Sequence, residues 1–421
     1  RYPIRFYPDV THNLRCEHPV HFDRDDWHYA FANTLSRESV NPRPEEYKRL
    51  FHTVAPYTVG SVTYSDGVND DVNKTVWCAL EWDDTLSAAE IAEDYARAYL
   101  YEYPTEETTA AILLLEKNWS GSPLEKRIDF THFAVNGVKQ KTNCWRFWQL
   151  YFRALCDKYV KERMLADTAA AGLARALIET GDVTGAKTAL NAPLPESVRS
   201  LRAEIDAAAK ALYDTVGMQL SVKGFGASGW ERGATLDTID LPITDRQWLL
   251  HLLNTLPPER ALGAIHRNDV EADEFYFSFA LHWPQGAGQT QAPDFYMNIQ
   301  GDRPDVNDGT LPMCLAKVYD HFSFDAAVRG LSAGRPYTLT VTFFKADERL
   351  LREIRVTANG IPLAPPVPSE ETALLPPRFS AFTYEIPADI VTDGALELSF
   401  SEQTTGFQIA ELKITHRRKT A

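Results

Sequence analysis

The chain has 421 residues, of which 44% are hydrophobic and 24% are charged. A chain of this length and composition can bury two or three hydrophobic cores, which excludes a disordered or fibrous protein. Its formal net charge is -15 and it has no long tract of lysine and arginine, which argues against nucleic acid as a partner because the polyanion would be repelled.

Metal, cofactor and membrane sites have no signature in the sequence. The five cysteines are widely scattered and show neither CxxC nor Cys/His metal spacing. No phosphate-binding glycine pattern occurs. The longest apolar run, "AAILLLE", is far shorter than the roughly 18 residues that span a membrane. We therefore predict no metal, no cofactor and no membrane span.

The first part of the chain alternates short apolar segments with helical stretches. "PIRFYPDV" and "VGSVTYS" have the composition of strands, whereas "PEEYKRLFHTVA", "VNKTVWCALEW" and "AAEIAEDYARAYLY" have helical periodicity. This rhythm is typical of β/α units with a parallel sheet. We expect Trp77 and Trp82, in the second helical stretch, to be buried.

The pattern then turns helical. Trp145, Trp148, Phe152, Leu155 and Tyr159 recur every three or four residues, which predicts one face of an amphipathic helix. We expect this aromatic face to pack in a core rather than to form a platform for stacking sugars. A second amphipathic stretch follows, and the glycine at position 217 stands where the C-cap of its helix is expected.

From about residue 270 the period changes to that of strands. Tyr337, Leu339, Val341 and Phe343 are predicted to point to one side of a strand, with the intervening threonines on an exposed face. Further on, Asn359-Gly360 is a strong hairpin signal. This part of the chain predicts a β-sandwich, which we expect to be chiefly structural because no row of exposed aromatics forms a sugar-binding surface.

The stretch "TYSDGVNDDVNK" places many polar side chains directly after an apolar segment. The pattern predicts a strand that ends near Tyr64, a loop and a helix that begins near Asp71. In α/β barrels the carboxyl ends of strands carry the working residues. Tyr64, Asp66 and Asn69 are therefore candidates for a site. For Asp70 and Asp71 an equal alternative is that they cap the helix.

A second polar group follows the first strand. Asp9, His12 and Arg15 lie at its carboxyl side, and Arg37 and Glu38 come shortly after. Carboxylates with neutral and cationic donors suit glycoside chemistry, in which acids perform catalysis and donors hold sugar hydroxyls. The alternatives are that Arg37 and Glu38 pair with other charges and that His12 is a packing residue.

Several segments together resemble a known family. "YPDVTHNLRCEHPV", "RESVNPRP", "TYSDGVNDDVNKTVWCALEWD", "NCWRFWQLYFRALCDKYV" and "RGATLDTIDLPITDRQWL" are similar to successive landmarks of large bacterial glycoside-hydrolase-like proteins. These have a (β/α)8 barrel related to the β-hexosaminidase and α-glucuronidase superfamily, then a helical region and a C-terminal β-sandwich. The resemblance implies a multidomain protein with the last barrel strands in residues 1–105, a helical domain in 106–268 and a β-sandwich in 269–421.

The resemblance also implies a secreted or periplasmic carbohydrate-active protein. We predict a glycoside hydrolase fragment acting on a polysaccharide or glycan, with Asp66 and Asp9 as catalytic candidates, and with a principal catalytic pair outside this chain. In the relatives the strand-end motif is TYSEG, and Asp66 stands in place of its glutamate. The alternative is a noncatalytic carbohydrate-binding or cell-surface interaction protein. The predicted substrate-binding residues are His12, Arg15, Arg37, Glu38, Tyr64, Asn69 and Asp70.

Overall fold

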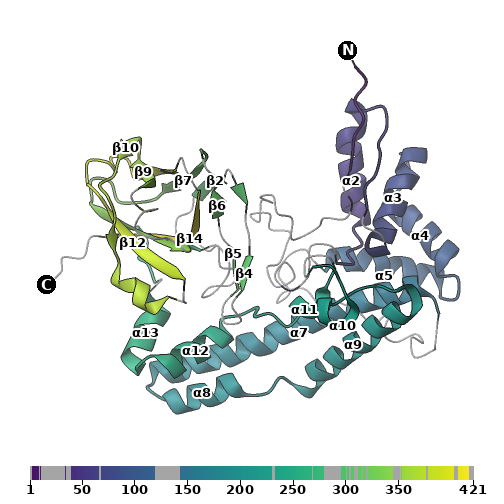
Figure 1. The fold of residues 1–421 in the computed structure, drawn as a ribbon, viewed down its shortest axis with the longest axis horizontal. Coiled ribbons are helices and arrows are strands. Elements are labelled where there is room, and N and C mark those ends of the chain that lie inside the picture. Colours follow the sequence, from purple (N-terminus) through teal and green to yellow (C-terminus); the bar gives the residue numbers. More distant parts are fainter. Residues whose placement is uncertain are drawn as a thin grey trace. The chain divides into compact units, whose positions relative to one another are not determined.

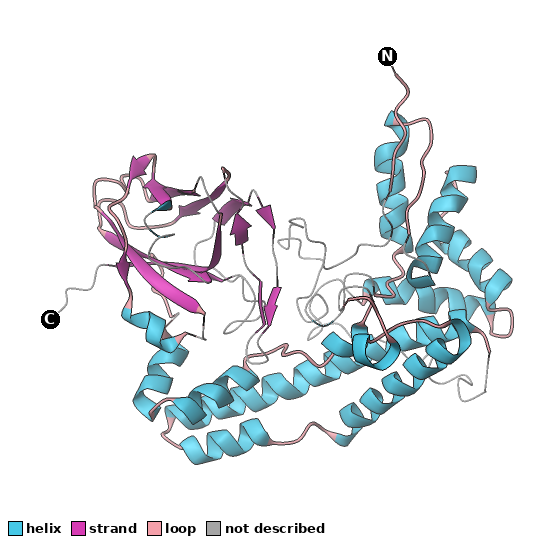
Figure 2. Cartoon of the chain, viewed as in Figure 1, coloured by secondary structure: helices cyan, strands magenta, loops and turns pink. Residues whose placement is uncertain are grey.

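The structure is a computed structural model, and its described part of the chain forms two compact units. The structure describes residues 2–8, 10, 34, 39–65, 68–118, 143–229, 233–267, 269–278, 295–299, 301–302, 305–307, 312–314, 316–318, 321–344, 351, 353–375, 378–402 and 406–416. The first unit takes its described residues from Arg1–Cys16, His21–Ala166 and Pro193–Leu241. The second takes them from Asp167–Ala192 and Pro242–Ala421. Helices and strands are distinguished in Figure 2.

The first unit is mainly helical (Figure 1). Its helices are α2 (Pro44–Val54), α3 (Asp71–Trp82), α4 (Ala88–Tyr99), α5 (Thr105–Lys117), α9 (Glu196–Val216), α10 (Val222–Phe225), α11 (Thr235–Thr238), the first part of α7 (Trp145–Glu179), and the short 3-10 helices η1 (Ala55–Tyr57) and η2 (Val68–Asp70). The helices predicted in the first 105 residues are present. Helix α4 begins where a capping box allows it, because Ser87 and Glu90 satisfy each other's backbone N–H groups.

Two extended segments of this unit pair in parallel. The N–H of Phe6 donates to the carbonyl of Gly60 over 3.1 Å, and the N–H of Val62 donates to the carbonyl of Phe6 over 3.0 Å. Phe6 faces α3, where its ring lies 5.9 Å from that of Trp77. With α2 between them in the sequence, the two segments form a β/α unit, in agreement with the predicted α/β class.

Aromatic residues of α7 and α3 show how helical position decides burial. Phe152, Leu155 and Tyr159 on α7 are buried, as predicted for a core face. On α3, Trp77 is 2% exposed, but Trp82 is 93% exposed, so the expectation that Trp82 is buried is wrong. Trp82 is the last residue of the helix and stands five positions after Trp77, which turns it to the opposite side.

The second unit combines helices with antiparallel sheets. A seven-stranded sheet has the order β11-β12-β8-β14-β6-β3, with β1 also paired to β14, and a five-stranded sheet has the order β10-β9-β13-β7-β2. The helices are the rest of α7, α8 (Val183–Asn191), α12 (Arg246–Thr255), α13 (Pro258–His266) and the 3-10 helix η3 (Glu370–Leu374). The strands are β1 (Phe275–Ser278), β2 (Phe295–Ile299), β3 (Gly301–Asp302), β4 (Asp305–Asn307), β5 (Pro312–Cys314), β6 (Ala316–Val318), β7 (Ser323–Arg329), β8 (Tyr337–Phe344), β9 (Arg355–Ala358), β10 (Ile361–Pro362), β11 (Val367–Pro368), β12 (Phe379–Ile386), β13 (Ala395–Ser401) and β14 (Phe407–His416).

Strand β8 is covered on both faces, which corrects the predicted exposed threonine face. Thr340 and Thr342 are 5% and 2% exposed. Phe344, on the same side of the strand, belongs to the core that α12 and α13 form with this sheet. The Thr342 hydroxyl donates to Glu411 over 2.8 Å, and Arg267 donates to both oxygens of that carboxylate over 2.7 and 2.9 Å. Threonines suit this face because a buried ionic group needs hydrogen-bond partners.

Two local predictions are confirmed by the backbone. Gly217 ends α9 in the left-handed conformation, with φ of 68°. Asn359 and Gly360 both have positive φ, 48° and 76°, and connect β9 to β10 as a tight hairpin. Each signal depends on the conformation of one or two residues, which is why the sequence shows it clearly.

The two units are not consecutive blocks of the sequence, because the helical part of the chain contributes to both of them. The domain boundaries after residues 105 and 268 stay predictions. No described helix, including the 35-residue α7, has a stretch apolar enough to cross a membrane.

Candidate active site

The candidate site lies where the two parallel segments end, in the first unit. The N–H of Tyr64 donates to the carbonyl of Pro8 over 2.9 Å, and the N–H of Val10 donates to the carbonyl of Tyr64 over 3.1 Å. The backbone on both sides of position 9 therefore bonds to Tyr64. The side chain of Tyr64 is 36% exposed, so its ring is open to solvent at this strand end.

Most of the predicted site residues fall outside the described part of the chain. Those six are Asp9, His12, Arg15, Arg37, Glu38 and Asp66. Tyr64, Asn69 and Asp70 are described, and η2 carries the latter two between the strand end and α3. We expect six of the nine to converge on the side where the strands end, and this convergence stays a prediction: Asp9, His12, Arg37, Tyr64, Asp66 and Asn69.

Asp70 fixes the strand end rather than capping the helix. It occupies the N-cap position of α3, yet its side chain makes no capping hydrogen bond. The Ser65 hydroxyl donates to its carboxylate over 2.9 Å, and Asp70 is 2% exposed. The capping alternative is therefore wrong for Asp70, and the residue instead ties the loop after Tyr64 to the first turn of α3.

Asp71 connects three helices. Its carboxylate accepts from the hydroxyl of Tyr95 on α4 and from Nε of Arg146 on α7, each over 2.6 Å. The Arg146 guanidinium lies between the rings of Tyr99 and Trp145, 4.0 and 4.1 Å from their centroids. Burial, followed by the charge of Asp71, raises the pKa of Tyr95 well above its usual value, so this phenol stays a donor. Asp71 also stands in the first turn of α3, where its negative charge interacts favourably with the positive end of the helix dipole.

Asn73 holds the buried loop 39–43, which follows Arg37 and Glu38 in the sequence. Its Oδ1 accepts from the N–H of Arg43 and its Nδ2 donates to the carbonyl of Asn41, both over 2.8 Å. The side chain is 3% exposed, so these bonds are shielded from water. The backbone that leads out of one predicted site segment is thus fixed to the helix that follows the other.

Arg153, on α7, holds the same loop from a second direction. Its Nη1 donates to the carbonyl of Val40 over 2.9 Å, and its Nη2 lies 2.6 Å from Asp157. Both charged side chains are at most 1% exposed. Burial raises the pKa of Asp157 to about 6 and lowers that of Arg153 to about 10, because both charged forms have lost their water.

The many polar side chains of "TYSDGVNDDVNK" are therefore explained in large part by their bonds to neighbouring segments. Asp70 binds Ser65 in the loop after Tyr64, Asn73 binds loop 39–43, and Asp71 joins α3 to α4 and α7. Asn73 lies in the same stretch, but its role was not predicted from the sequence. Arg153 and Asp157 stand four residues apart on α7, a spacing that allows an ion pair, but their other partners, Val40 and Asn118, are remote in sequence, so their link to loop 39–43 was not predicted.

A cavity of about 360 Å³ lies at the other end of the parallel segments, between the C-terminal ends of α2 and α3. Gly60, Ser61, Trp77, Glu81 and Trp82 are among its lining residues. It opens near the start of the second segment, so it is separate from the strand ends. Within the described residues, three potential metal ligands converge in the second unit, at the end of β14.

The fold defines a multidomain protein that combines a helical α/β unit with a unit of antiparallel sheets and helices. No protein-family profile matches the chain, and no curated protein matches it. One solved structure that it matches is a family GH115 4-O-methyl-α-glucuronidase with specificity for decorated arabinogalactans. The alignment covers 98% of this chain and 51% of that one, at 9% identity and a TM-score of 0.27. The chain spans about half the length of that enzyme. A similarity of this size does not assign a family or a function to this chain.

Proposed function

We propose that this chain is part of a bacterial, secreted or periplasmic glycoside hydrolase that acts on a polysaccharide or glycan. The observation that carries the proposal is the parallel pairing of segments 4–10 and 59–64, whose carboxyl ends meet at Tyr64. Both polar segments predicted from the sequence begin at these ends, which is where α/β barrels place their working residues.

The proposed fold is a (β/α)8 barrel of the β-hexosaminidase and α-glucuronidase type, of which the two segments are the last strands. Their side chains support this: Phe6 and Ser61 face α3, where each contacts Trp77, while Val62, next to Ser61 and on the other face, is 44% exposed. Parallel sheets are normally buried on both faces, so the rest of a barrel would cover this face. For the second unit, the proposal is that the two larger sheets form a β-sandwich.

In the proposed mechanism carboxylates act on the glycosidic bond. Asp66 stabilises the positive charge that develops on the sugar ring, and Asp9 is the second carboxylate of this chain. Arg37, Glu38 and Tyr64 hold sugar hydroxyls, together with His12, Arg15 and Asn69. Asp70, predicted as a substrate-binding residue, is buried and instead positions the loop after Tyr64. A principal acid from another barrel strand completes the site. Asn73 and Arg153 act as positioning residues through loop 39–43.

Hydrolysis of a panel of aryl glycosides tests the proposal, in the protein that contains this chain. Asp66→Asn is expected to lower kcat by about 100-fold or more while the melting temperature stays unchanged, because an amide does not replace a carboxylate facing a cationic transition state. Asp84→Asn, at an exposed residue near the C-terminal end of α3, is the matched control. Turnover like that of the wild type in Asp66→Asn would reduce Asp66 to a structural role.

The second candidate is a noncatalytic carbohydrate-binding or cell-surface interaction protein. It is favoured by one observation: Asp66 replaces the glutamate of the TYSEG motif, and its side chain is one methylene shorter. Saturable glycan binding without hydrolysis of any substrate in the panel would support this alternative.

A further inference from the structure

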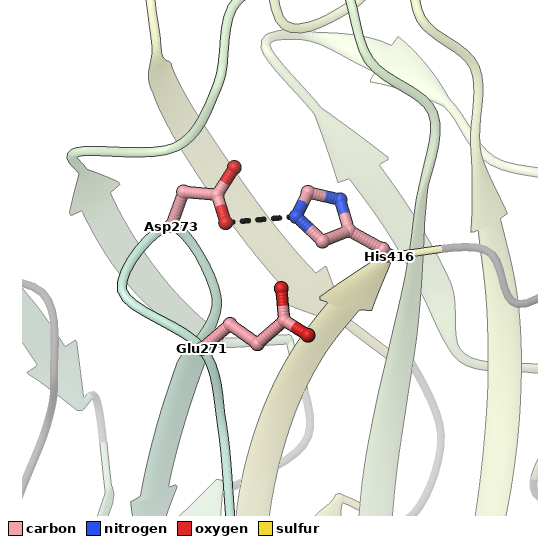
Figure 3. Close-up of side chains that lie close together, drawn as sticks. All are labelled: Glu271, Asp273 and His416. Carbon is pink, nitrogen blue, oxygen red and sulfur yellow. Dashed lines mark hydrogen bonds and ion pairs between the residues drawn. The ribbon is translucent and has the colours of Figure 1, made fainter.

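Three potential metal ligands from distant parts of the sequence converge at the C-terminal end of β14 (Figure 3). Nε2 of His416 lies 2.8 Å from a carboxylate oxygen of Asp273, which is 143 residues earlier in the chain. Glu271 lies beside them, and one donor atom from each residue lies within 4.8 Å of the other two. One imidazole nitrogen and two carboxylates therefore face the same small volume.

Strand pairing explains why these residues meet. Strands β1 and β14 are antiparallel with Phe275 opposite Ile414, and continuing this register places position 273 opposite His416. The buried Glu274 fixes the geometry, because its carboxylate accepts from the backbone N–H of His416 over 2.7 Å and from that of Glu271 over 2.9 Å. The backbone of all three candidate ligands is thus tied together.

Neighbouring groups orient two of the ligands. The Tyr337 ring stacks on the His416 imidazole with 4.9 Å between centroids. The Ser332 hydroxyl donates to Asp273, and its N–H donates to the Tyr337 hydroxyl over 2.7 Å. Partners of this kind are typical around the ligands of metal sites.

One cationic side chain, Arg335, lies against the cluster. Its Nη1 is 3.7 Å from Asp273 Oδ2 and 3.4 Å from His416 Nε2. The Arg335 side chain is 60% exposed, so it can move into water when another cation enters. Because it repels a cation at the site, its removal provides a test that does not disturb the ligands.

We propose that Glu271, Asp273 and His416 bind a divalent transition metal ion of the Zn²⁺ type. One imidazole with carboxylates suits Zn²⁺ better than Ca²⁺ or Mg²⁺, which prefer oxygen ligands alone. Zinc bonds of about 2.0–2.2 Å at tetrahedral angles separate ligand atoms by about 3.3 Å. The 2.8 Å separation of Asp273 and His416 therefore needs only a small side-chain rotation. The bound ion would link the segment before β1 to the end of β14.

His266 offers a matched control within the same unit. It also lies between two carboxylates, with Nδ1 2.8 Å from Asp269 and Nε2 2.8 Å from Glu179. These acids occupy opposite ring nitrogens, so a single ion cannot bind the histidine and both carboxylates. The residue types match those of the proposed site, and the geometry does not.

Calorimetric titration of the chelator-treated full chain with Zn²⁺ tests the proposal, with thermal unfolding as a second readout. The wild type is expected to bind one ion and to gain thermal stability. His416→Ala should lose this binding, and His266→Ala should keep it. Arg335→Ala should bind about fivefold tighter because one nearby positive charge is removed, whereas Arg329→Ala, at another exposed arginine, should bind as the wild type does.

Two results would overturn the proposal. One is the absence of saturable Zn²⁺ binding to the wild type at millimolar concentration. The other is an equal loss of binding in His416→Ala and His266→Ala, which would show that scattered surface histidines hold the metal. Circular dichroism checks that each variant folds, and Asp273→Asn replaces His416→Ala if that variant does not.

Discussion

The start of helix α3 and the end of strand β14 use similar residue types in opposite ways. At α3, Asp70, Asp71 and Asn73 are nearly adjacent in sequence, and each one bonds to a different neighbouring segment. At β14, Asp273 and His416 are far apart in sequence and bond to each other beside the exposed Glu271. A dense polar motif thus marks a place where several segments are held, whereas ligand groups that face one another can leave no trace in the sequence.

The largest effect is expected where a buried charge of the first region loses its partner. Arg153→Met should lower the free energy of unfolding by about 3–5 kcal/mol, because it leaves the Asp157 carboxylate buried without its cation. Arg335→Met, at the exposed arginine beside β14, should change it by less than about 0.5 kcal/mol. Urea unfolding followed by tryptophan fluorescence measures both. Equal effects would show that the two regions do not differ as described.

Asn73→Ala should cost about 1–3 kcal/mol, because a buried N–H and a buried carbonyl of loop 39–43 lose their partner. The same measurement on Asn191→Ala, at an exposed end of α8, is the control and should show little change. If the proposed function holds, Asn73→Ala should also raise KM for the glycoside by loosening the loop after Arg37 and Glu38. A destabilised variant with unchanged KM would confine Asn73 to a structural role.

The buried Asp157 predicts a pH dependence of the first unit. Its pKa is about 3.9 in the unfolded chain and about 6 in the folded one, so folding takes up a proton between these values. The contribution of Asp157 to stability is therefore greatest below about pH 4 and falls as the pH rises towards 6. Thermal unfolding of wild type and Asp157→Asn across this window checks it. The difference in melting temperature between the two proteins should change with pH, and a constant difference would contradict the prediction.

The smallest effect is expected at β14 without metal. His416→Ala should lower the stability of the chelator-treated chain by less than about 1 kcal/mol, because its hydrogen bond with Asp273 joins two side chains that are 20% and 27% exposed. Thermal unfolding with and without Zn²⁺ separates this from the proposed metal effect. A large loss in the absence of metal would place His416 among the structural residues, as at α3.

Local features were predicted well because they depend on few residues. Helix α3 begins at Asp71, Gly217 ends α9, and Asn359-Gly360 forms a hairpin, as the sequence indicated. Each follows from backbone preferences or periodicity that neighbouring residues alone define. The core positions of Tyr337 and Phe343, 1% and 0% exposed, were predicted for the same reason.

What the sequence left undecided is which surfaces become covered and which distant groups meet. The threonine face of β8 is buried because α12 and α13 pack on that sheet, and Trp82 is exposed because no described element covers that side of α3. Asn73 gained its role only when loop 39–43 came to lie beside it, and His416 met Asp273 only through the pairing of β1 with β14. Periodicity along one segment specifies the direction of a side chain, but the partner that it finds there is determined by the packing of segments that the sequence keeps apart.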